Sequence, residues 1–310
     1  MHLLALAAIP FPEIDPALIR FELFGLEVAL RWYALAYIGG LLIGWWLMLR
    51  LMKRPSLWPG DRAPMTPEQP EEMLTWMVIG VVLGGRLGFV MFYNPGYYWA
   101  NPWEILQVWQ GGMAFHGGFL GVILATFIYT RAKGIPLLSA GDAVALATPT
   151  GLLLGRIANF INGELWGRPT DAPWGMVFPS VADMGRIYPQ LLPGGENVPR
   201  HPSQLYEAAL EGLLLLVIMW WLALARGWLK RPGALVGVFF IGYGAARSFV
   251  ENFRQGNAEF LSPDNPFGHY WRLGAGPDAA GLTMGQILSL PMIAIGAAFL
   301  LIAFRRRRTA

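Results

Sequence analysis

Polar side chains stand at the end of an apolar run, where a membrane helix should carry none. Residues 155–168 read Gly-Arg-Ile-Ala-Asn-Phe-Ile-Asn-Gly-Glu-Leu-Trp-Gly-Arg and directly follow the apolar stretch 143–154. A charged residue near the centre of a bilayer costs about 2.5–3.5 kcal/mol on insertion scales, so it persists where a polar partner receives it. Arg156 and Asn159 are three residues apart and share a helix face. This pattern predicts a pocket for an anionic head group.

Other apolar runs carry ionisable residues as well. Tyr243, Arg247 and Glu251 are spaced four residues apart, so they lie on one helical stripe. His116 stands near the start of another apolar run, and Glu207 stands near the start of a further one. If the runs are membrane helices, these side chains reach a similar depth from separate segments. We therefore predict that they converge on the same site.

The composition indicates a membrane protein. Of 310 residues, 55% are hydrophobic and 14% are charged, and the mean hydropathy is +0.43. A soluble protein carries about 25% charged residues. The 14 Trp and 10 Tyr fit aromatic belts at the two membrane surfaces. The basic residues are dispersed into loops and a terminal cluster, which argues against a nucleic-acid partner, and the absence of cysteine excludes a thiol nucleophile within the chain.

Apolar segments of suitable length predict seven transmembrane helices. They cover approximately 32–51, 73–92, 111–130, 143–161, 205–225, 234–253 and 282–304. Basic residues concentrate in alternate connections, at 50–62, 131–133, 226–231 and 305–308, and such residues stay on the cytoplasmic side. This places the amino terminus outside and the carboxyl terminus in the cytoplasm.

The predicted fold is therefore an all-α polytopic membrane protein with a single membrane domain over 1–310. Residues 163–204 are polar and rich in Pro and Gly, and we expect them to form a small periplasmic head insert. Residues 254–281 form a second outer segment. Residues 1–31, with three prolines and several acidic groups, should lie along the membrane surface.

Each of these signals also has a purely structural interpretation. Arg247 and Glu251 could form a structural ion pair, and His116 could be a helix-end histidine bonded to a carbonyl. Arg86, which lies among glycines, could be an interfacial anchor whose side chain extends outward. Arg156 fits such an interpretation least well. It shares its turn with Asn159 and precedes a carboxylate, Glu164, that is flanked by Gly163 and Gly167, where the chain can turn tightly.

Several segments resemble those of one bacterial enzyme family, the phosphatidylglycerol:prolipoprotein diacylglyceryl transferases. The resemblance runs in order over nearly the whole chain, and the run Asn-Phe-Ile-Asn-Gly-Glu-Leu-Trp-Gly-Arg is its most specific part. The matching segments are 11–16, 31–33, 111–118 (Gly-Gly-Met-Ala-Phe-His-Gly-Gly), 155–168, 201–207 (His-Pro-Ser-Gln-Leu-Tyr-Glu) and 242–251 (Gly-Tyr-Gly-Ala-Ala-Arg-Ser-Phe-Val-Glu).

The resemblance implies an enzyme of the bacterial inner membrane that acts toward its periplasmic side. It would move the diacylglyceryl group of phosphatidylglycerol onto the lipobox cysteine of a prolipoprotein signal peptide and release glycerol 1-phosphate. The implied catalytic residues are His116, Arg156, Arg247, Glu207 and Glu251. The implied phosphatidylglycerol-binding residues are Arg156, Asn159, Glu164, Gly167, Tyr33, Tyr243, Arg247 and Arg86.

The residue types suit such chemistry independently. A thiolate would attack an sp3 carbon and displace a phosphate monoester. Arginine binds phosphate oxygens in a bidentate fashion and stabilises the charge that grows on the leaving group. A thiol is only slightly ionised at neutral pH, so a base helps, and the candidates are His116, Glu207, Glu251 or a water molecule. The sequence contains no metal-ligand motif, and we expect neither a metal nor another cofactor.

Two other functions are less favoured by the sequence. A transporter or binding protein for phospholipids or anions would use the same polar residues without covalent chemistry. Many transporters contain internal repeats with paired broken helices, and this chain shows no convincing duplication. A membrane protease is weaker still, because the sequence has no G-x-S-x-G motif and no pair of Asp residues in facing spans.

Overall fold

The computed structural model describes residues 9–12, 14–23, 25–93, 95–179, 198–256 and 258–305. Within them the chain is predominantly helical. The long helices are α1 (Trp32–Met52), α2 (Gln69–Phe92), α4 (Phe115–Lys133), α5 (Leu137–Ile161), α9 (Ala234–Val250) and α10 (Met284–Arg305). A further continuous run consists of α7 (Ser203–Glu207), the π-helical segment η6 (Ala208–Leu214) and α8 (Leu215–Leu224). Shorter elements include α3 (Pro95–Ala100) and the 3-10 turns η3 (Pro102–Leu106) and η4 (Val108–Gln110).

Five of these helices are long and apolar enough to cross a membrane. They are α1, α2, α5, the run Ser203–Leu224 and α10. Helices α4 and α9 occupy the other two predicted ranges, although α9 has 17 residues and is at the short limit for a span. Helical structure is therefore present at all seven predicted places.

Some predicted helix boundaries are wrong, for identifiable reasons. The third helix begins at Phe115 and not at Gly111, because Gly111 and Gly112 have positive φ angles of 85° and 77° that a helix excludes. The fourth helix begins at Leu137, six residues before the predicted start, and this places Asp142 inside it. Asp142 is fully buried, and its two carboxylate oxygens accept hydrogen bonds from the backbone N–H groups of Gly233 (2.8 Å) and Val236 (2.9 Å) at the start of α9.

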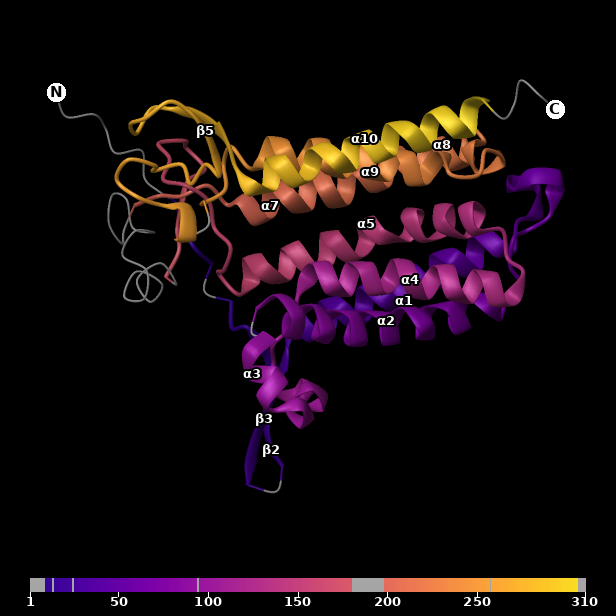
Figure 1. Cartoon of the computed structure of the whole chain (residues 1–310), viewed down its shortest axis with the longest axis horizontal. Coiled ribbons are helices and arrows are strands. Elements are labelled where there is room, and N and C mark those ends of the chain that lie inside the picture. Colours follow the sequence, from indigo (N-terminus) through magenta and orange to yellow (C-terminus); the bar gives the residue numbers. More distant parts are fainter. Residues whose placement is uncertain are drawn as a thin grey trace.

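The chain also contains short strands that an all-α prediction misses. Strands β2 (Ala17–Leu23) and β3 (Leu26–Arg31) form an antiparallel hairpin that leads directly into α1. In Figure 1 this hairpin and α3 extend away from the helices. The other strands are β1 (Ile9–Pro10) paired with β4 (Met176–Val177), and β5 (Trp271–Leu273) paired with β6 (Ala280–Leu282).

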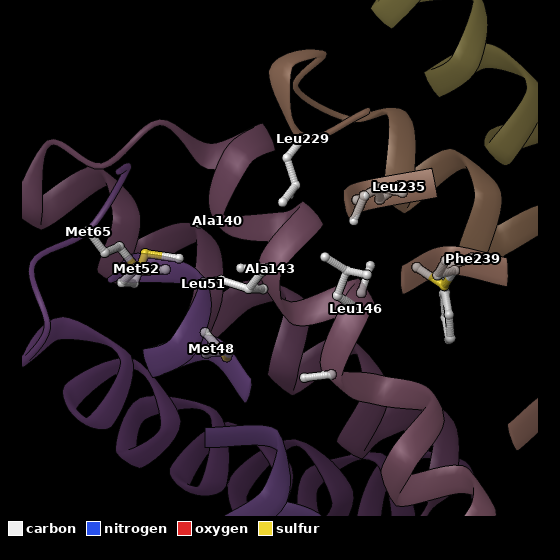
Figure 2. Packing of buried hydrophobic residues seen from close by; sticks show 14 of the residues in the cluster. Met48, Leu51, Met52, Met65, Ala140, Ala143, Leu146, Leu229, Leu235 and Phe239 are labelled. Atoms are coloured by element: carbon white, nitrogen blue, oxygen red, sulfur yellow. The ribbon is translucent and has the colours of Figure 1, made fainter. Parts of the chain in front are cut away.

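Figure 1 shows the helices in two groups, with α1, α2, α4 and α5 in one and α7, α8, α9 and α10 in the other. Helix α5 joins the two, because it packs against α1, against η6 and against α9. The main apolar core lies along this junction: Leu51 of α1, Leu146 of α5 and Leu235 of α9 are fully buried in it (Figure 2).

Helices α2 and α4 approach each other through glycines. A Cβ atom added to Gly84 would lie 2.3 Å from the carbonyl oxygen of Gly117, and one added to Gly121 would lie 1.9 Å from that of Gly80. Neither position tolerates a side chain without moving a helix backbone. In the part of the chain that the structure describes, these glycines therefore form a helix-packing face.

Candidate functional site

The loop that follows α5 is shaped by glycines and by local hydrogen bonds. Gly163 and Leu165 have positive φ angles of 65° and 57°, so the chain turns sharply on both sides of Glu164. Asn159 donates its side-chain amide to Glu164 Oε1 at 2.8 Å. A Cβ on Gly167 would lie 2.4 Å from the carbonyl oxygen of Phe253, so glycine is required at this crossing.

This loop is fixed to the ends of two other helices. Ser203 Oγ, at the start of α7, donates to the Leu165 carbonyl at 2.9 Å, and the side-chain amide of Gln204 donates to the Glu164 carbonyl. Arg168 donates from Nε to the carbonyl of Arg254, just beyond α9, at 2.7 Å. The position of the loop is therefore defined by segments that are distant from it in the sequence.

The side chain of Glu207 is the centre of an ion-pair cluster. Arg156 Nη1 of α5 lies 3.2 Å from Glu207 Oε2, and Arg247 Nη1 of α9 lies 2.5 Å from Glu207 Oε1. Arg254 Nη1 lies 3.5 Å from the same Oε1. Glu207 is fully buried, whereas the three arginine side chains are 16–19% exposed. Guanidinium groups from α5 and α9 thus meet at one carboxylate.

Two further carboxylates balance the charge of the cluster. Glu251 Oε1 lies 2.5 Å from Arg247 Nη2, and its Oε2 accepts a hydrogen bond from Thr283 Oγ1 at 2.8 Å. Glu211 Oε2 lies 3.5 Å from Arg156 Nη2. Three guanidinium groups therefore face three carboxylates, and the cluster is formally neutral when all six groups are ionised.

The arginines are not held equally. Arg247 has two contacts of 2.5 Å, whereas the two carboxylate contacts of Arg156 are 3.2 and 3.5 Å. Charge-assisted N–H···O bonds are usually about 2.7–2.9 Å long. Arg156 is therefore the more weakly paired of the two cations. An incoming anion can bind its N–H donors with a smaller loss of ion-pair energy than it could those of Arg247.

Two tyrosines predicted for the site lie near these charges. Tyr33, at the start of α1, is within electrostatic range of Arg156 and Glu164 and shares a hydroxyl–hydroxyl hydrogen bond of 3.1 Å with Tyr37. Tyr243 on α9 is within electrostatic range of Arg156 and Arg247. The helices α1, α5, α7 and α9 and the segment η6 therefore all contribute to one polar region.

Arg86 and His116 belong to the paired helices α2 and α4. Arg86 is buried, and its guanidinium donates to the backbone carbonyls of Glu104, Ile105 (2.8 Å), Gly111 (2.7 Å) and Gly112 (3.3 Å). His116 is the second residue of α4 and is exposed. Of these two predicted site residues, Arg86 therefore has a clear structural role in holding the chain before α4.

Ionisable groups also gather in the segments outside the helices. Arg200 is fully buried, stacks over the ring of Trp166 at 4.4 Å, and has its pKa lowered to about 10 by burial. Burial and the nearby charge of Arg168 lower the pKa of His201 below its ordinary value. Among the described residues, no group of three or more His, Asp, Glu or Cys side chains is arranged to hold a metal ion.

The predicted site does not include three residues that the structure places in or beside the cluster. They are Arg168, Glu211 and Thr283. Arg254 also joins the cluster, as its place eleven residues after Tyr243, on the same helical face, implies. A signal existed for Glu211, because it follows Glu207 by four residues within an apolar run, and two carboxylates on one face of a membrane helix need partners. No pattern in the sequence indicates that Thr283 bonds to Glu251.

The fold and the site define a helical membrane protein in which buried arginines and carboxylates from several helices meet beside a glycine-shaped loop. A family model described as prolipoprotein diacylglyceryl transferase matches residues 19–302. The chain belongs to this family.

Similar proteins named phosphatidylglycerol–prolipoprotein diacylglyceryl transferase occur in several bacteria. The chain is 57% identical over 291 residues to the protein of Roseobacter denitrificans, covering 94% of this chain and 96% of the relative. It is 55% identical over 296 residues to that of Ruegeria pomeroyi, covering 95% and 97%. It is 56% identical over 303 residues to one from Cereibacter sphaeroides, covering 97% and 99%.

Proposed function

We propose that the chain transfers the diacylglyceryl group of phosphatidylglycerol to the cysteine thiol of a prolipoprotein. The family match and the names of the relatives support this assignment over transport or binding without chemistry. The structural observation that carries it is the meeting of Arg156 and Arg247 at Glu207, because it brings two cations from separate helices to one place.

In this proposal Arg156 binds the phosphate and Arg247 is the second cation. The contacts of Arg156 with Glu207 and Glu211 are long, so phosphate oxygens can replace them. Arg247 is fixed between Glu207 and Glu251 and supplies charge at a set position. Asn159 and Gly167 shape the adjoining loop around Glu164, and Tyr33 and Tyr243 complete the pocket.

The chemical step is a substitution at carbon. The thiolate sulfur attacks the methylene carbon that carries the phosphate, a C–S bond forms as the C–O bond breaks, and the electron pair leaves with the phosphate oxygen. The products are a thioether and glycerol 1-phosphate. Guanidinium groups stabilise the negative charge that develops on the leaving oxygen.

The thiol proton needs an acceptor, and we assign that role to His116. Glu207 and Glu251 are each held by two or more arginines and would have to leave them to reach a thiol. The imidazole of His116 is exposed at the first turn of α4, and an imidazole nitrogen can accept a proton.

The membrane arrangement belongs to the same proposal. Seven helices, including α4 and α9, would cross the bacterial inner membrane, with the amino terminus outside. The cluster and the loop 163–168 would then face the periplasmic side; the predicted head insert 163–204 lies partly outside the described residues, at 180–197. The basic residues at the other ends of the helices, among them Arg50, Lys133 and Lys230, support this orientation.

The proposal is tested by incubating the purified protein with phosphatidylglycerol and a peptide that contains a lipobox cysteine. We expect the peptide to gain the mass of one diacylglyceryl group and glycerol 1-phosphate to appear in equal amount. A peptide with serine in place of the cysteine should gain nothing. Movement of lipid between vesicles without a covalent product would overturn the enzyme assignment in favour of a transporter.

A further inference from the structure

Glu211 is a buried carboxylate that the proposed chemical step leaves without a role. Its side chain is fully buried, and its nearest cation, Arg156, lies 3.5 Å away on Oε2. Its other oxygen, Oε1, is inaccessible to solvent and has no hydrogen-bond donor among the described residues. A buried charged oxygen without a donor costs free energy, so its presence in an apolar helix requires a functional or structural reason.

The backbone conformation around Glu211 places its side chain next to Arg156. Residues Ala208–Leu214 form a π-helical segment inside an otherwise α-helical run, and π-helical turns often occur at functional sites. The next residue, Gly212, contacts the backbone of α5 so closely that a Cβ would lie 2.8 Å from Leu153 Cα. Arg156 follows Leu153 by about one helical turn. The close approach therefore places Glu211 beside this arginine.

The charges that face Glu211 come from several elements. Arg156 approaches from α5, Glu207 from α7, Tyr243 and Arg247 from α9, and Arg254 from the turn after it. Arg247 has two contacts of 2.5 Å with Glu207 and Glu251, so these three groups hold one another firmly. Among the three carboxylates of the cluster, Glu211 has the weakest hold on a cation, because its shortest contact is 3.5 Å whereas Glu207 and Glu251 each have one of 2.5 Å.

We propose that Glu211 is a positioning residue that competes with phosphate for Arg156, an inference that rests on the proposed transfer function. In the empty site its carboxylate neutralises Arg156 and keeps the guanidinium facing the cluster. When phosphatidylglycerol binds, the phosphate takes over the Nη2 donor. Glu211 then remains beside the phosphate as a like charge.

This arrangement favours release of the product. The substrate is a phosphodiester with one negative charge, and the leaving group is a phosphate monoester that carries up to two. Repulsion between like charges grows with their product, so Glu211 opposes the bound monoester more strongly than the bound diester. The carboxylate therefore weakens substrate binding somewhat and weakens product binding more.

Variants of Glu211 separate this role from simple packing. Glu211→Gln and Glu211→Met remove the charge and keep a similar volume, whereas Glu211→Asp keeps the charge. We expect both uncharged variants to lower the KM for phosphatidylglycerol and the inhibition constant of glycerol 1-phosphate. The inhibition constant should fall by about tenfold, the change that 1.4 kcal/mol produces. Their kcat should fall, because the product leaves more slowly.

The control variants define the outcomes. Glu211→Asp should stay within about twofold of the parent in KM, and so should Glu72→Gln, which removes an exposed carboxylate paired with Lys133 at 2.7 Å on another part of the protein. The amount of each protein in the membrane and its melting temperature are measured alongside. A purely structural role would raise KM or lower the folded amount in all three Glu211 variants and would not separate them by charge.

Two failures are distinguishable. If the parent protein transfers diacylglyceryl but the uncharged variants bind glycerol 1-phosphate no more tightly than Glu211→Asp, the competition by Glu211 is refuted. If the parent forms no thioether with any peptide, the proposed function itself fails. In that case tighter binding of glycerol 1-phosphate by Glu211→Gln would still support the role of Glu211 at an anion site.

Discussion

Two arginines in apolar helices, Arg86 and Arg156, look alike in the sequence but have different surroundings. Arg86 donates to four backbone carbonyls of residues 104–112, which fix a loop onto α2. Arg156 faces the carboxylates of Glu207 and Glu211 at 3.2 and 3.5 Å. Backbone carbonyls cannot leave without unfolding the loop, whereas carboxylate side chains can turn away. The partners of a buried arginine therefore distinguish a structural tie from a site that can exchange one anion for another.

Arg168 extends this comparison. It lies close to the cluster, yet its hydrogen bonds go to the carbonyls of Arg254 (2.7 Å), Phe267 (3.2 Å) and Glu251 (3.3 Å). Like Arg86, Arg168 donates to backbone carbonyls, and we expect it to hold the loop after α5 in place. Distance from the cluster is thus a poorer guide to an arginine's role than the kind of acceptor it meets.

The largest effect should come from replacing Arg156. Arg156→Ala should reduce transfer by at least about a hundredfold, because it removes the cation that stabilises the leaving phosphate. The protein should still insert into the membrane, and its melting temperature should fall, because Glu207 and Glu211 stay buried after losing a cation. Thioether formation with a lipobox peptide measures the first quantity, and thermal unfolding in detergent measures the second. Turnover near that of the parent would remove Arg156 from the phosphate site.

Replacing Arg86 should lower stability without reducing transfer per folded protein. Arg86→Ala removes hydrogen bonds from a buried guanidinium to backbone carbonyls, and hydrogen bonds to charged groups contribute about 1.5–3 kcal/mol each. We expect a clear fall in melting temperature and increased proteolysis within residues 95–112, while the remaining folded protein keeps a KM for phosphatidylglycerol close to that of the parent. A raised KM with unchanged stability would show that Arg86 binds lipid, and the comparison with Arg156 would fail.

The smallest effect concerns the pH dependence of stability that His201 contributes. Burial and Arg168 lower the pKa of His201, so the folded protein favours the neutral imidazole. A histidine ionises near pH 6.5 in an unfolded chain. The contribution of neutral His201 to the stability of the folded protein is therefore fully present above that pH. It is lost as the pH falls through the lower pKa of the folded protein. We expect the melting temperature to fall less between pH 7.5 and 5.5 in His201→Gln than in the parent. Equal falls would show that the folded protein does not lower the pKa of His201.

The positions of the helices could largely be predicted from the sequence, because an apolar run of span length is costly to leave in water and is stable as a helix in a membrane. Helices lie at all seven predicted ranges. Their ends were less predictable: the fourth span was expected to begin at residue 143, but α5 begins at Leu137, and the carboxylate of Asp142 within it caps the start of α9. A contact between residues more than ninety positions apart leaves no local signal.

The sequence predicted that Arg156, Glu207, Arg247 and Glu251 lie together, but the prediction did not include Glu211 and Thr283 or most of the charge pairs. The four-residue spacing of Arg247 and Glu251 implied the contact that the structure shows at 2.5 Å. The sequence could not show that Glu207 is shared by Arg156, Arg247 and Arg254, because this depends on how three segments approach one another. The π-helical turn at Ala208–Leu214 was also hidden, since most of its residues are ordinary helix formers.

The hydrogen bonds from Gly233 and Val236 to Asp142 have a mechanical consequence for the site. They join α5 and α9 near their starts, and Arg156 and Arg247 each lie roughly 20 Å further along these two helices. The two helices are thus tied near their starts by backbone hydrogen bonds to Asp142, and near Arg156 and Arg247 by the shared carboxylate of Glu207. A bound phosphate can replace the second tie without disturbing the first.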